Sequence, residues 1–494
     1  MNEKRIRLRA APSPTGYMHI GNLRTYIYDL LLAKQTGGDF ILRIEDTDQS
    51  RFVEGATVNL CKILKRLGIV PNEGVWLAED GETLMQRGEF GPYIQSERKT
   101  KHQEYAQKLL DMDKAYYCFC TEERLAEMRK LQEATHQPTG YDGHCRKLDV
   151  NEAKKRVEAG EPHVVRLKLP KEGNVTVDDA IRGKVSFEWK LIDDQVIVKQ
   201  DGMATYHLAS MVDDHDMEIT HVLRGEEWLS SAPKHIFIYQ AFGWDVPIFA
   251  HLPLLLNPDR TKLSKRQGDV SVESYLDKGY LPQTLINFLA LCGWNPSDKQ
   301  EIYSVEELTK LFNLSKINKS GAIFNLEKLN WLNNHYLREM DVSSYLKLVY
   351  EHLPQDEKDV DFKGRIALMF RDRLNVPSDI AELSSFMFKS TLDYAATPLT
   401  WKDHSVEEAV ERLETVRQWI EQIDDSNLKE VKSAEEDIKS KIVDKGWGNG
   451  DTLWPLRVAL SGQAKSPSPF ELIVAYGKER TLARIDEAVA YLLK

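Results

Sequence analysis

The chain has 494 residues, of which 42% are apolar, and 66 Lys plus Arg against 77 Asp plus Glu give a net charge of −11. At about 150 residues per domain, this length predicts about three domains, and the composition excludes a disordered chain, a fibre and a small disulfide scaffold. The acidic balance argues against indiscriminate nucleic-acid binding. It is compatible with a nucleic-acid partner that contacts local clusters of Lys and Arg.

The sequence shows neither a secretory signal nor a membrane-spanning segment. Residues 1–9 are charged and no apolar stretch follows them, and nowhere do about 18 uncharged apolar residues run together. We therefore expect a cytoplasmic protein without a membrane partner. Five cysteines, an odd number, favour reduced thiols or a metal site over a disulfide framework.

The amino-terminal segment predicts a strand, a helix and a second strand. Charged and apolar residues alternate over residues 5–10, and a Pro- and Gly-rich loop follows at 12–16. From Asn22 apolar residues recur at helical spacing until a Gly pair at 37–38, and residues 40–44 form a buried-strand run. This order is a βαβ unit. The loop of this unit has neither a Gly-x-Gly-x-x-Gly turn nor a Walker A sequence. The sequence therefore does not favour a dinucleotide-binding site or a P-loop nucleotide site.

The rest of the chain divides by composition. Residues 116–205 are rich in β-branched side chains and contain candidate strands at 164–169, 185–189 and 196–199. The region beyond residue 325 has long amphipathic helical patterns. The predicted parts are a catalytic α/β domain in two pieces (1–115 and 206–256), an inserted α+β domain (116–205), a segment with a basic loop (257–325) and an α-helical region (326–494).

The tetrapeptide HIGN at residues 19–22 lies where the first loop meets the predicted helix. Free backbone N–H groups and the helix dipole favour an anionic phosphate at such a helix start. Gly21 would allow a nucleotide to approach the backbone closely, and His19 can donate a hydrogen bond to a phosphate oxygen. A plainer interpretation of His19 is that it only caps the helix.

A second segment, KLSKR at residues 262–266, lies in a loop bounded by Pro and Gly. Its cations can close on a triphosphate, and a positioned ammonium group stabilises the charge that develops on phosphoryl oxygens in the transition state. Lys265 is the predicted residue for this role. The alternative is a solvated charge run of the kind found on many protein surfaces.

Together the two segments resemble the HIGH and KMSKS signatures of class I aminoacyl-tRNA synthetases. Further segments look like those of the glutamyl-tRNA synthetase family in their usual order, namely RAAPSPTG (9–16), RIEDTD (43–48), YHL (206–208), VDDHDM (212–217), RGEEW (224–228), LPLL (252–255) and PLRVALSG (455–462). The resemblance covers nearly the whole chain. It implies a Rossmann-like α/β catalytic domain with an inserted α+β domain, followed by an all-α anticodon-binding region.

The resemblance also implies roles for individual residues. The residues expected to surround glutamate are Arg9, Glu45, Tyr206 and Arg224; those expected to line ATP are Ser13, His19, Gly21, Glu227, Trp228, Leu255 and Lys265; and those expected to stabilise the reacting phosphate are His19, Lys262 and Lys265. A guanidinium matches the γ-carboxylate in bidentate geometry, and Glu45 can receive the ammonium group. Outside this resemblance, Arg9 and Glu45 would be interpreted as a salt bridge at a strand end. Ser210 stands where some relatives place an Asn that holds the amino acid, so that contact is not transferred.

The inserted region contains Cys118, Cys120 and, further along the chain, Cys145. Three thiolates suit Zn²⁺, and either Tyr141 or His144 could complete a tetrahedral shell. Some relatives carry a zinc site with this cysteine spacing, but Lys147 here replaces the His of their last ligand. The zinc would be structural. The alternative is a packed cluster of free cysteines.

The predicted activity is ATP- and Mg²⁺-dependent ligation of L-glutamate to tRNA(Glu), with tRNA(Gln) as a further candidate, by a monomer. The helical region would bind the anticodon through Lys, Arg and stacking aromatics; its tryptophans are Trp331, Trp401, Trp419, Trp447 and Trp454. Three alternatives are the short paralogue that glutamylates a modified base of tRNA(Asp), a nucleotidyltransferase of the HIGH-containing superfamily, and a synthetase-derived RNA-binding protein without activity. The long helical region argues against the first, and intact His19, Lys262 and Lys265 argue against the last.

Overall fold

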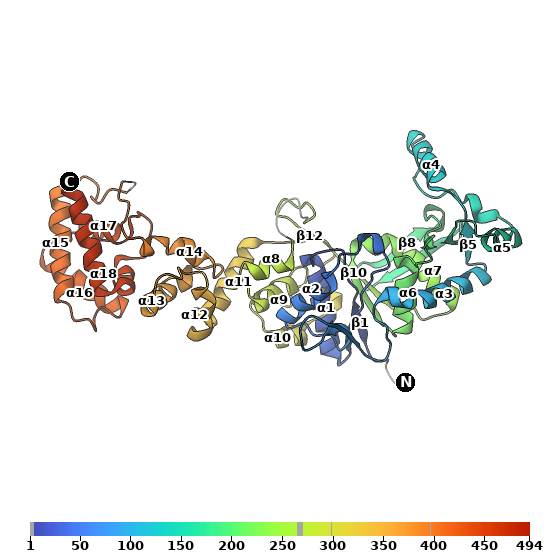
Figure 1. The fold of residues 1–494 in the computed structure, drawn as a ribbon, viewed down its shortest axis with the longest axis horizontal. Coiled ribbons are helices and arrows are strands. Elements are labelled where there is room, and N and C mark those ends of the chain that lie inside the picture. Colours follow the sequence, from blue (N-terminus) through green and yellow to red (C-terminus); the bar gives the residue numbers. More distant parts are fainter. Residues whose placement is uncertain (1–3, 264–269, 298, 396) are drawn as a thin grey trace. The chain divides into compact units, whose positions relative to one another are not determined.

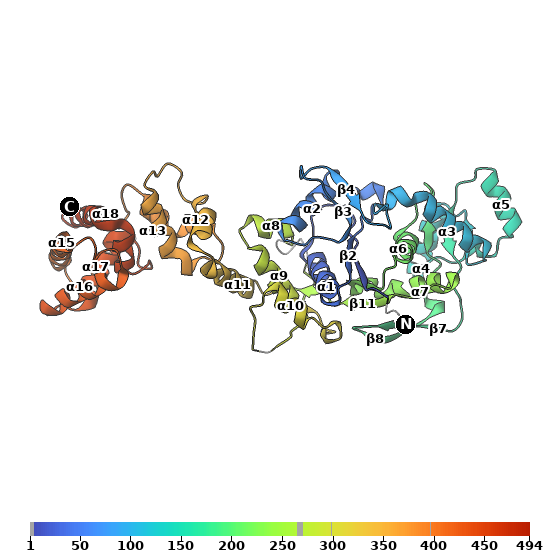
Figure 2. The same ribbon diagram turned by 90° about the horizontal axis from the view of Figure 1, so that it is seen from below.

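The predicted βαβ unit is present in the computed structural model, which describes residues 4–263, 270–297, 299–395 and 397–494. Strands β1 (Arg7–Ala10) and β2 (Asp39–Leu42) pair in parallel, and helix α1 (Ile20–Thr36) connects them and packs against both (Figures 1 and 2). All residues of both strands are buried. Helix α1 ends at Gly37, whose φ of 64° is the left-handed conformation that favours glycine at this position. The Gly pair therefore stops the helix as predicted.

Two four-stranded sheets form the α/β core. The first continues from β2 to β3 (Glu73–Leu77) and the antiparallel β4 (Leu84–Arg87). The second has the order β10 (His221–Gly225), β11 (Ile248–Leu252), β7 (Asn174–Asp179) and β8 (Gly183–Glu188). Thr220, just before β10, donates its backbone N–H to the carbonyl oxygen of Arg7 at 3.0 Å, so the second sheet lies beside β1.

The region between the two catalytic pieces contributes to two different sheets. Strands β5 (Ala115–Cys118), β6 (Val164–Leu167) and β9 (Val196–Val198) form an antiparallel sheet of their own. In contrast, the β7–β8 hairpin joins the second core sheet, where Asp179 pairs with Phe249 of β11. The remaining helices of this region are α4 (Glu122–Ala134) and α5 (Val150–Glu158).

Helices surround the core strands. They are α2 (Ala56–Arg66), α3 (Lys99–Asp111), α6 (Tyr206–Asp216), α7 (Ala232–Phe242), α8 (Val272–Asp277), α9 (Pro282–Ala290) and α10 (Val305–Leu311). Strand β12 (Leu255–Leu256), just before the basic loop, pairs in parallel with β13 (Ala322–Ile323). Among the described residues, no helix is both long enough and apolar enough to cross a membrane.

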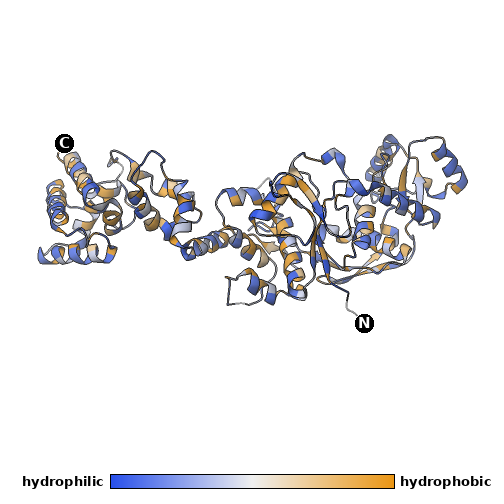
Figure 3. Cartoon of the chain, turned by 60° about the horizontal axis from the view of Figure 1, so that its bottom comes forward, coloured by the Kyte–Doolittle hydropathy of each residue, from blue (hydrophilic) through white to orange (hydrophobic). Residues whose placement is uncertain are grey.

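The chain divides into two units, residues 1–329 and 330–494, within helix α11 (Leu326–Glu339). The second unit is helical, as predicted, and its described residues contain no strand. Its helices are α12 (Val342–Tyr350), α13 (Val360–Phe370), α14 (Asp379–Leu383), α15 (Val406–Gln422), α16 (Val431–Asp444), α17 (Asn449–Ser461) and α18 (Pro469–Leu492). Apolar residues gather on the helix faces that pack together (Figure 3).

Candidate active site

The HIGN segment begins helix α1, and His19 is the N-cap residue. The Nδ1 atom of His19 accepts a hydrogen bond of 3.0 Å from the backbone N–H of Gly21. In the neutral ring this leaves the proton on Nε2, which makes that atom a donor. A Cβ atom at position 21 would lie 3.1 Å from Nδ1, so glycine leaves room for the imidazole. His19 therefore caps the helix, and the same contact fixes the orientation of its ring.

The segment that follows the basic loop returns to the HIGN segment. Ile20 donates its backbone N–H to Val270 at 2.9 Å, and Val272 donates to Met18 at 3.0 Å. At the other end of the loop, Lys262 is exposed and pairs with Leu256 of β12. The HIGN segment is thus joined through the backbone to residues 270 and 272, which follow the basic loop, whereas Lys262 pairs with β12. Lys265 lies outside the described residues.

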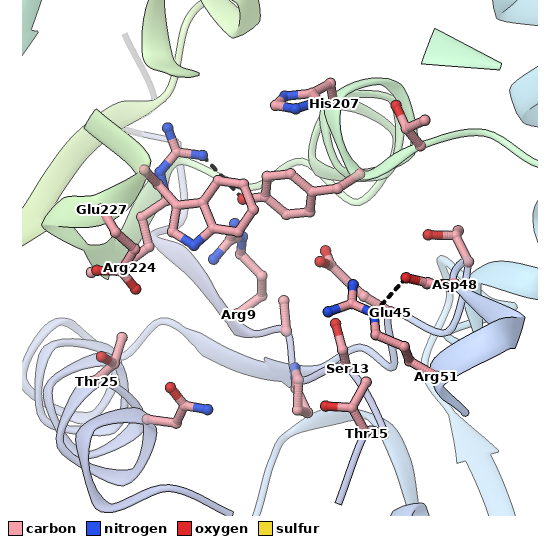
Figure 4. A pocket seen from close by; sticks show the side chains of 18 of the residues that line it. Arg9, Ser13, Thr15, Thr25, Glu45, Asp48, Arg51, His207, Arg224 and Glu227 are labelled. Atoms are coloured by element: carbon pink, nitrogen blue, oxygen red, sulfur yellow. Dashed lines mark hydrogen bonds and ion pairs between the residues drawn. The ribbon is translucent and has the colours of Figure 1, made fainter. Parts of the chain in front are cut away.

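A cavity of about 580 Å³ opens beside the HIGN segment, between the carboxyl ends of β1 and β10 and the start of α6 (Figure 4). Residues from several of the quoted motifs line it, namely Arg9, Ser13, Asn22, Glu45, Tyr206, Arg224, Glu227 and Trp228. Of the other predicted site residues, His19, Gly21, Leu255 and Lys262 are described but are not part of this lining. Leu255 is buried in β12.

One wall of the cavity is an ion-pair network centred on Asp214. Arg9 donates through Nε to Asp214 at 3.0 Å, and Arg43 lies 2.7 Å from the same carboxylate. Burial by itself lowers the pKa of Arg9, but Asp214 and Glu45 outweigh it and raise that pKa above the ordinary value. Glu45 accepts hydrogen bonds from Arg43, at 2.8 Å, and from the hydroxyl of Ser210. Arg9 and Glu45 consequently lie in one cavity but pair with different partners.

The opposite wall holds a second arginine in a different environment. Arg224, at the end of β10, is 6% exposed and donates from Nη1 to the Tyr206 hydroxyl at 3.1 Å. Its other hydrogen-bond partners are the rings of His235 and His251. Its Nη2 atom is buried and has no hydrogen-bond partner among the described residues. Within the described structure this guanidinium forms no ion pair, and its hydrogen bonds go to a hydroxyl and two imidazole rings.

An aromatic face adjoins Arg224. The rings of Tyr206 and Trp228 lie 4.2 Å apart between centroids and are tilted by 38°. Glu227 is exposed at the same end of β10, and its carboxylate turns back over Gly225, where a Cβ atom would lie 2.2 Å from a carboxylate oxygen. A flat apolar surface beside an acceptor is suited to a nucleoside base and its ribose hydroxyls.

Several lining residues were not predicted from the sequence. Asp48 and Arg51, which both line the cavity, form an ion pair of 2.6 Å; Asp48 is the last residue of the RIEDTD segment and Arg51 follows it closely. His207 stands inside the quoted YHL segment. Gln195 and Lys199 also line the cavity, and they come from the inserted region, where no motif marks them.

The three cysteines of the inserted region meet in one cluster. The Sγ atoms of Cys118, Cys120 and Cys145 all lie within 4.8 Å of one another. The Tyr141 hydroxyl lies 3.3 Å from the Cys118 sulfur and 3.6 Å from the Cys120 sulfur, whereas His144 is exposed. The donor set is soft and compact, as a zinc site requires, and it places Tyr141 beside the thiols.

In the helical unit, most of the tryptophans pack in pairs. Trp401 and Trp454 lie 5.2 Å apart, and Trp419 and Trp447 lie 5.9 Å apart, between ring centroids. Trp331 is separate and 48% exposed. The paired rings are half-buried, so they contribute to the packing of this unit as well as to its surface.

Comparison with known proteins agrees with this geometry. Residues 5–331 match the family described as "tRNA synthetases class I (E and Q), catalytic domain", and residues 328–489 match "Anticodon binding domain". The chain is 43% identical to a glutamate–tRNA ligase of Clostridioides difficile (97% of this chain, 98% of that one) and 42% identical to one of Alkaliphilus metalliredigens (99% of each).

A solved structure is similar over the whole chain. It is a glutamate–tRNA ligase of Elizabethkingia meningosepticum in complex with its amino acid, with 37% identity, a TM-score of 0.86 and coverage of 99% of this chain and 100% of that chain. The predicted fold class is thereby confirmed. The chain belongs to the glutamate–tRNA ligase family of class I aminoacyl-tRNA synthetases.

Proposed function

We propose that this chain ligates L-glutamate to the 3′ end of tRNA(Glu), with ATP, through a glutamyl-adenylate. The observation that carries the proposal is the cavity that Arg224 and Glu45 both line, in which Arg224 has no ion-pair partner within the described structure. A buried cation and a carboxylate across one cavity complement an amino acid that carries an extra carboxylate.

In this proposal Arg9 and Arg224 bind the γ-carboxylate, Glu45 receives the ammonium group, and Tyr206 orients the side chain. Glutamine is rejected because its neutral amide cannot neutralise a buried guanidinium, and because its NH₂ group would face a donor. The hydroxyl of Ser210 helps to hold Glu45, so this residue also contributes to the site, although indirectly.

The chemistry requires no covalent intermediate with the protein. The α-carboxylate of glutamate attacks the α-phosphorus of ATP, the bond to the bridging oxygen breaks, and diphosphate leaves. His19, Lys262 and Lys265 stabilise the charge on the phosphoryl oxygens. A hydroxyl of the terminal adenosine of the tRNA then attacks the acyl carbon, and AMP leaves.

The nucleotide in this proposal is held by side chains from both motifs. Its binding residues are Ser13, His19, Gly21, Glu227, Trp228, Leu255 and Lys265. Class I synthetases use ATP with Mg²⁺. The ion would supply countercharge to the triphosphate.

We further propose a structural zinc held by Cys118, Cys120, Cys145 and Tyr141, because these four side chains already lie in contact. The helical unit would read the anticodon of tRNA(Glu), with tRNA(Gln) as a second candidate, in a cytoplasmic monomer. Exposed bases stack on aromatic rings and Arg planes, and Trp331, which is 48% exposed, offers such a surface.

One assay tests the activity. The purified chain is given radiolabelled glutamate and ATP with tRNA(Glu), tRNA(Gln), tRNA(Asp) or no RNA. The radiolabel that precipitates with the tRNA in acid is then counted. Charging of tRNA(Glu) is the expected result, and charging of tRNA(Gln) in addition would extend the partner list. Modification of tRNA(Asp) alone, adenylylation without RNA, or binding without turnover would each overturn the proposal in favour of one of the alternatives.

A further inference from the structure

The side chains behind Arg224 form one continuous hydrogen-bonded chain. Arg224 donates from Nε to Nε2 of His251 at 3.0 Å, and from Nη1 to Nδ1 of His235 at 3.1 Å. Both histidines are completely buried. Arginine is only a donor, so each histidine must present an unprotonated nitrogen to it.

This requirement fixes the proton on the far nitrogen of each ring. For His251 that nitrogen is Nδ1, which lies 2.6 Å from the Asp179 carboxylate. For His235 it is Nε2, which lies 3.0 Å from Nδ1 of His207. Asp179 and His207 are therefore the acceptors that hold the inner rings in the tautomers that Arg224 needs.

The same chain keeps the histidines neutral. Burial and the charge of Arg224 lower the pKa of His235, and for His251 they outweigh Asp179, which by itself raises that pKa. Burial, Lys234 and Arg224 lower the pKa of His207 to about 4. At neutral pH the two histidine rings that accept hydrogen bonds from Arg224 are therefore uncharged. Arg9, in contrast, forms an ion pair with Asp214.

We propose that Asp179, His251, His235 and His207 are positioning residues for amino-acid selection. They hold Arg224 in place without neutralising it, so that its full charge is available to the γ-carboxylate. A carboxylate in the place of either inner histidine would compensate the guanidinium and weaken its preference for glutamate over glutamine. This inference rests on the proposed role of Arg224.

The variant Asp179→Asn tests the tautomer. Oδ1 of Asp179 accepts from the backbone N–H groups of Ile181 and Arg182, at 2.9 and 2.7 Å, and the amide oxygen of Asn can keep those contacts, whereas Oδ2 accepts from the backbone N–H of His251, at 3.0 Å, as well as from its ring. The NH₂ group of Asn would then donate to Nδ1 of His251, so the ring proton would move to Nε2. The Nε2–H of His251 and the Nε–H of Arg224 would then both be donors and could not form a hydrogen bond with each other. We expect the KM for glutamate to rise about tenfold or more, as for one charged hydrogen bond, and the KM for ATP to be unchanged.

The variant His251→Gln tests whether an acceptor that does not depend on Asp179 can replace the imidazole of His251. Its amide oxygen can occupy the position of Nε2 and accept from Arg224 without any help from Asp179. We expect His251→Gln alone to raise the glutamate KM only a few-fold, and Asp179→Asn to add nothing further in that background. A purely structural role for Asp179 would instead give losses that add, or equal losses in the KM values for glutamate and ATP, and either result would overturn the proposal.

Two controls separate this inference from the function on which it rests. If the unaltered chain does not charge tRNA(Glu), the proposed function fails. If it does, and Arg224→Lys raises the glutamate KM while Asp179→Asn leaves that KM and the rejection of glutamine unchanged, the function stands and the positioning role is wrong.

Discussion

The backbone N–H of Ile20, at the start of α1, donates to the carbonyl oxygen of Val270, a residue 250 positions later in the chain. Together with the bond from Val272 to Met18, this joins the HIGN segment to the end of the basic loop. The junction places the chain that follows the basic loop at the start of α1, and the common action of both segments on one triphosphate stays a prediction.

The first prediction concerns the basic loop. We expect Lys265→Ala to slow adenylate formation by about 10²- to 10³-fold, because a positioned cation stabilises the transition state more than the ground state. Single-turnover formation of glutamyl-adenylate in the presence of tRNA(Glu) measures this step. Lys310→Ala, which removes an exposed lysine of α10, is the control. An unchanged rate would remove Lys265 from the site.

The second prediction concerns the room that Gly21 leaves for His19. A methyl group at position 21 would lie 3.1 Å from the Nδ1 atom, so we expect Gly21→Ala to turn the imidazole and to slow adenylate formation by about 10-fold or more. Gly140→Ala, whose Cβ atom would make an ordinary contact of 3.5 Å, should have no such effect. Equal rates for both variants would show that the orientation of His19 does not matter.

The third prediction concerns Ser210, which donates a hydrogen bond to Glu45. We expect Ser210→Ala to raise the KM for glutamate about 3- to 10-fold with little change in kcat, since one neutral donor to a carboxylate is lost. Ser384→Ala removes an equally buried serine from the helical unit and should leave the glutamate KM unchanged. A kcat effect without a KM effect would contradict the assignment.

The fourth prediction concerns the cysteine cluster. We expect about one zinc per chain by elemental analysis and none in the double variant Cys118→Ser, Cys145→Ser. Tyr141→Phe should lose the metal to a chelator faster than the original chain, whereas His144→Ala should not. Absence of zinc after purification with the metal supplied would favour three packed thiols.

The fifth prediction concerns the partly buried pair of Arg7 and Glu73, whose closest atoms lie 2.7 Å apart. Burial by itself raises the pKa of Glu73, but hydrogen bonds from Arg7 and Tyr93 outweigh it and lower that pKa below the ordinary value. The pair therefore stabilises the fold fully above the unfolded-state pKa of about 4.3, and the contribution is lost as the pH falls through the lowered folded-state pKa. We expect Glu73→Gln to reduce the unfolding temperature at pH 7 and to have little effect near pH 2. Equal reductions at both values would contradict this explanation.

Local patterns predicted much of the fold and of the site. Alternation, helical spacing and a glycine stop were sufficient for β1, α1 and β2, because each depends on residues close in sequence. The motif positions likewise predicted that Arg9, Glu45, Tyr206 and Arg224 belong together, and all four line one cavity. Their chemical roles remain predictions.

Pairings between distant segments could not be predicted in this way. Nothing local to Arg9 indicates that it binds Asp214 rather than Glu45, because that choice depends on how β1 packs against α6. Similarly, the composition of residues 116–205 predicted strands, but not that β7 would join β11. The two inner histidines, His235 and His251, carry no motif spacing either, since α7 and β11 bring them to Arg224 of β10.

The pairing of β7 with β11 has a consequence for protein engineering. A shortened chain that joined residue 115 directly to residue 206 would delete β7 and leave the backbone of β11 without a neighbour along one side. An open strand edge of this kind promotes self-association. A minimal catalytic fragment of this protein must therefore retain the hairpin at residues 174–188, whatever else of the intervening region is removed.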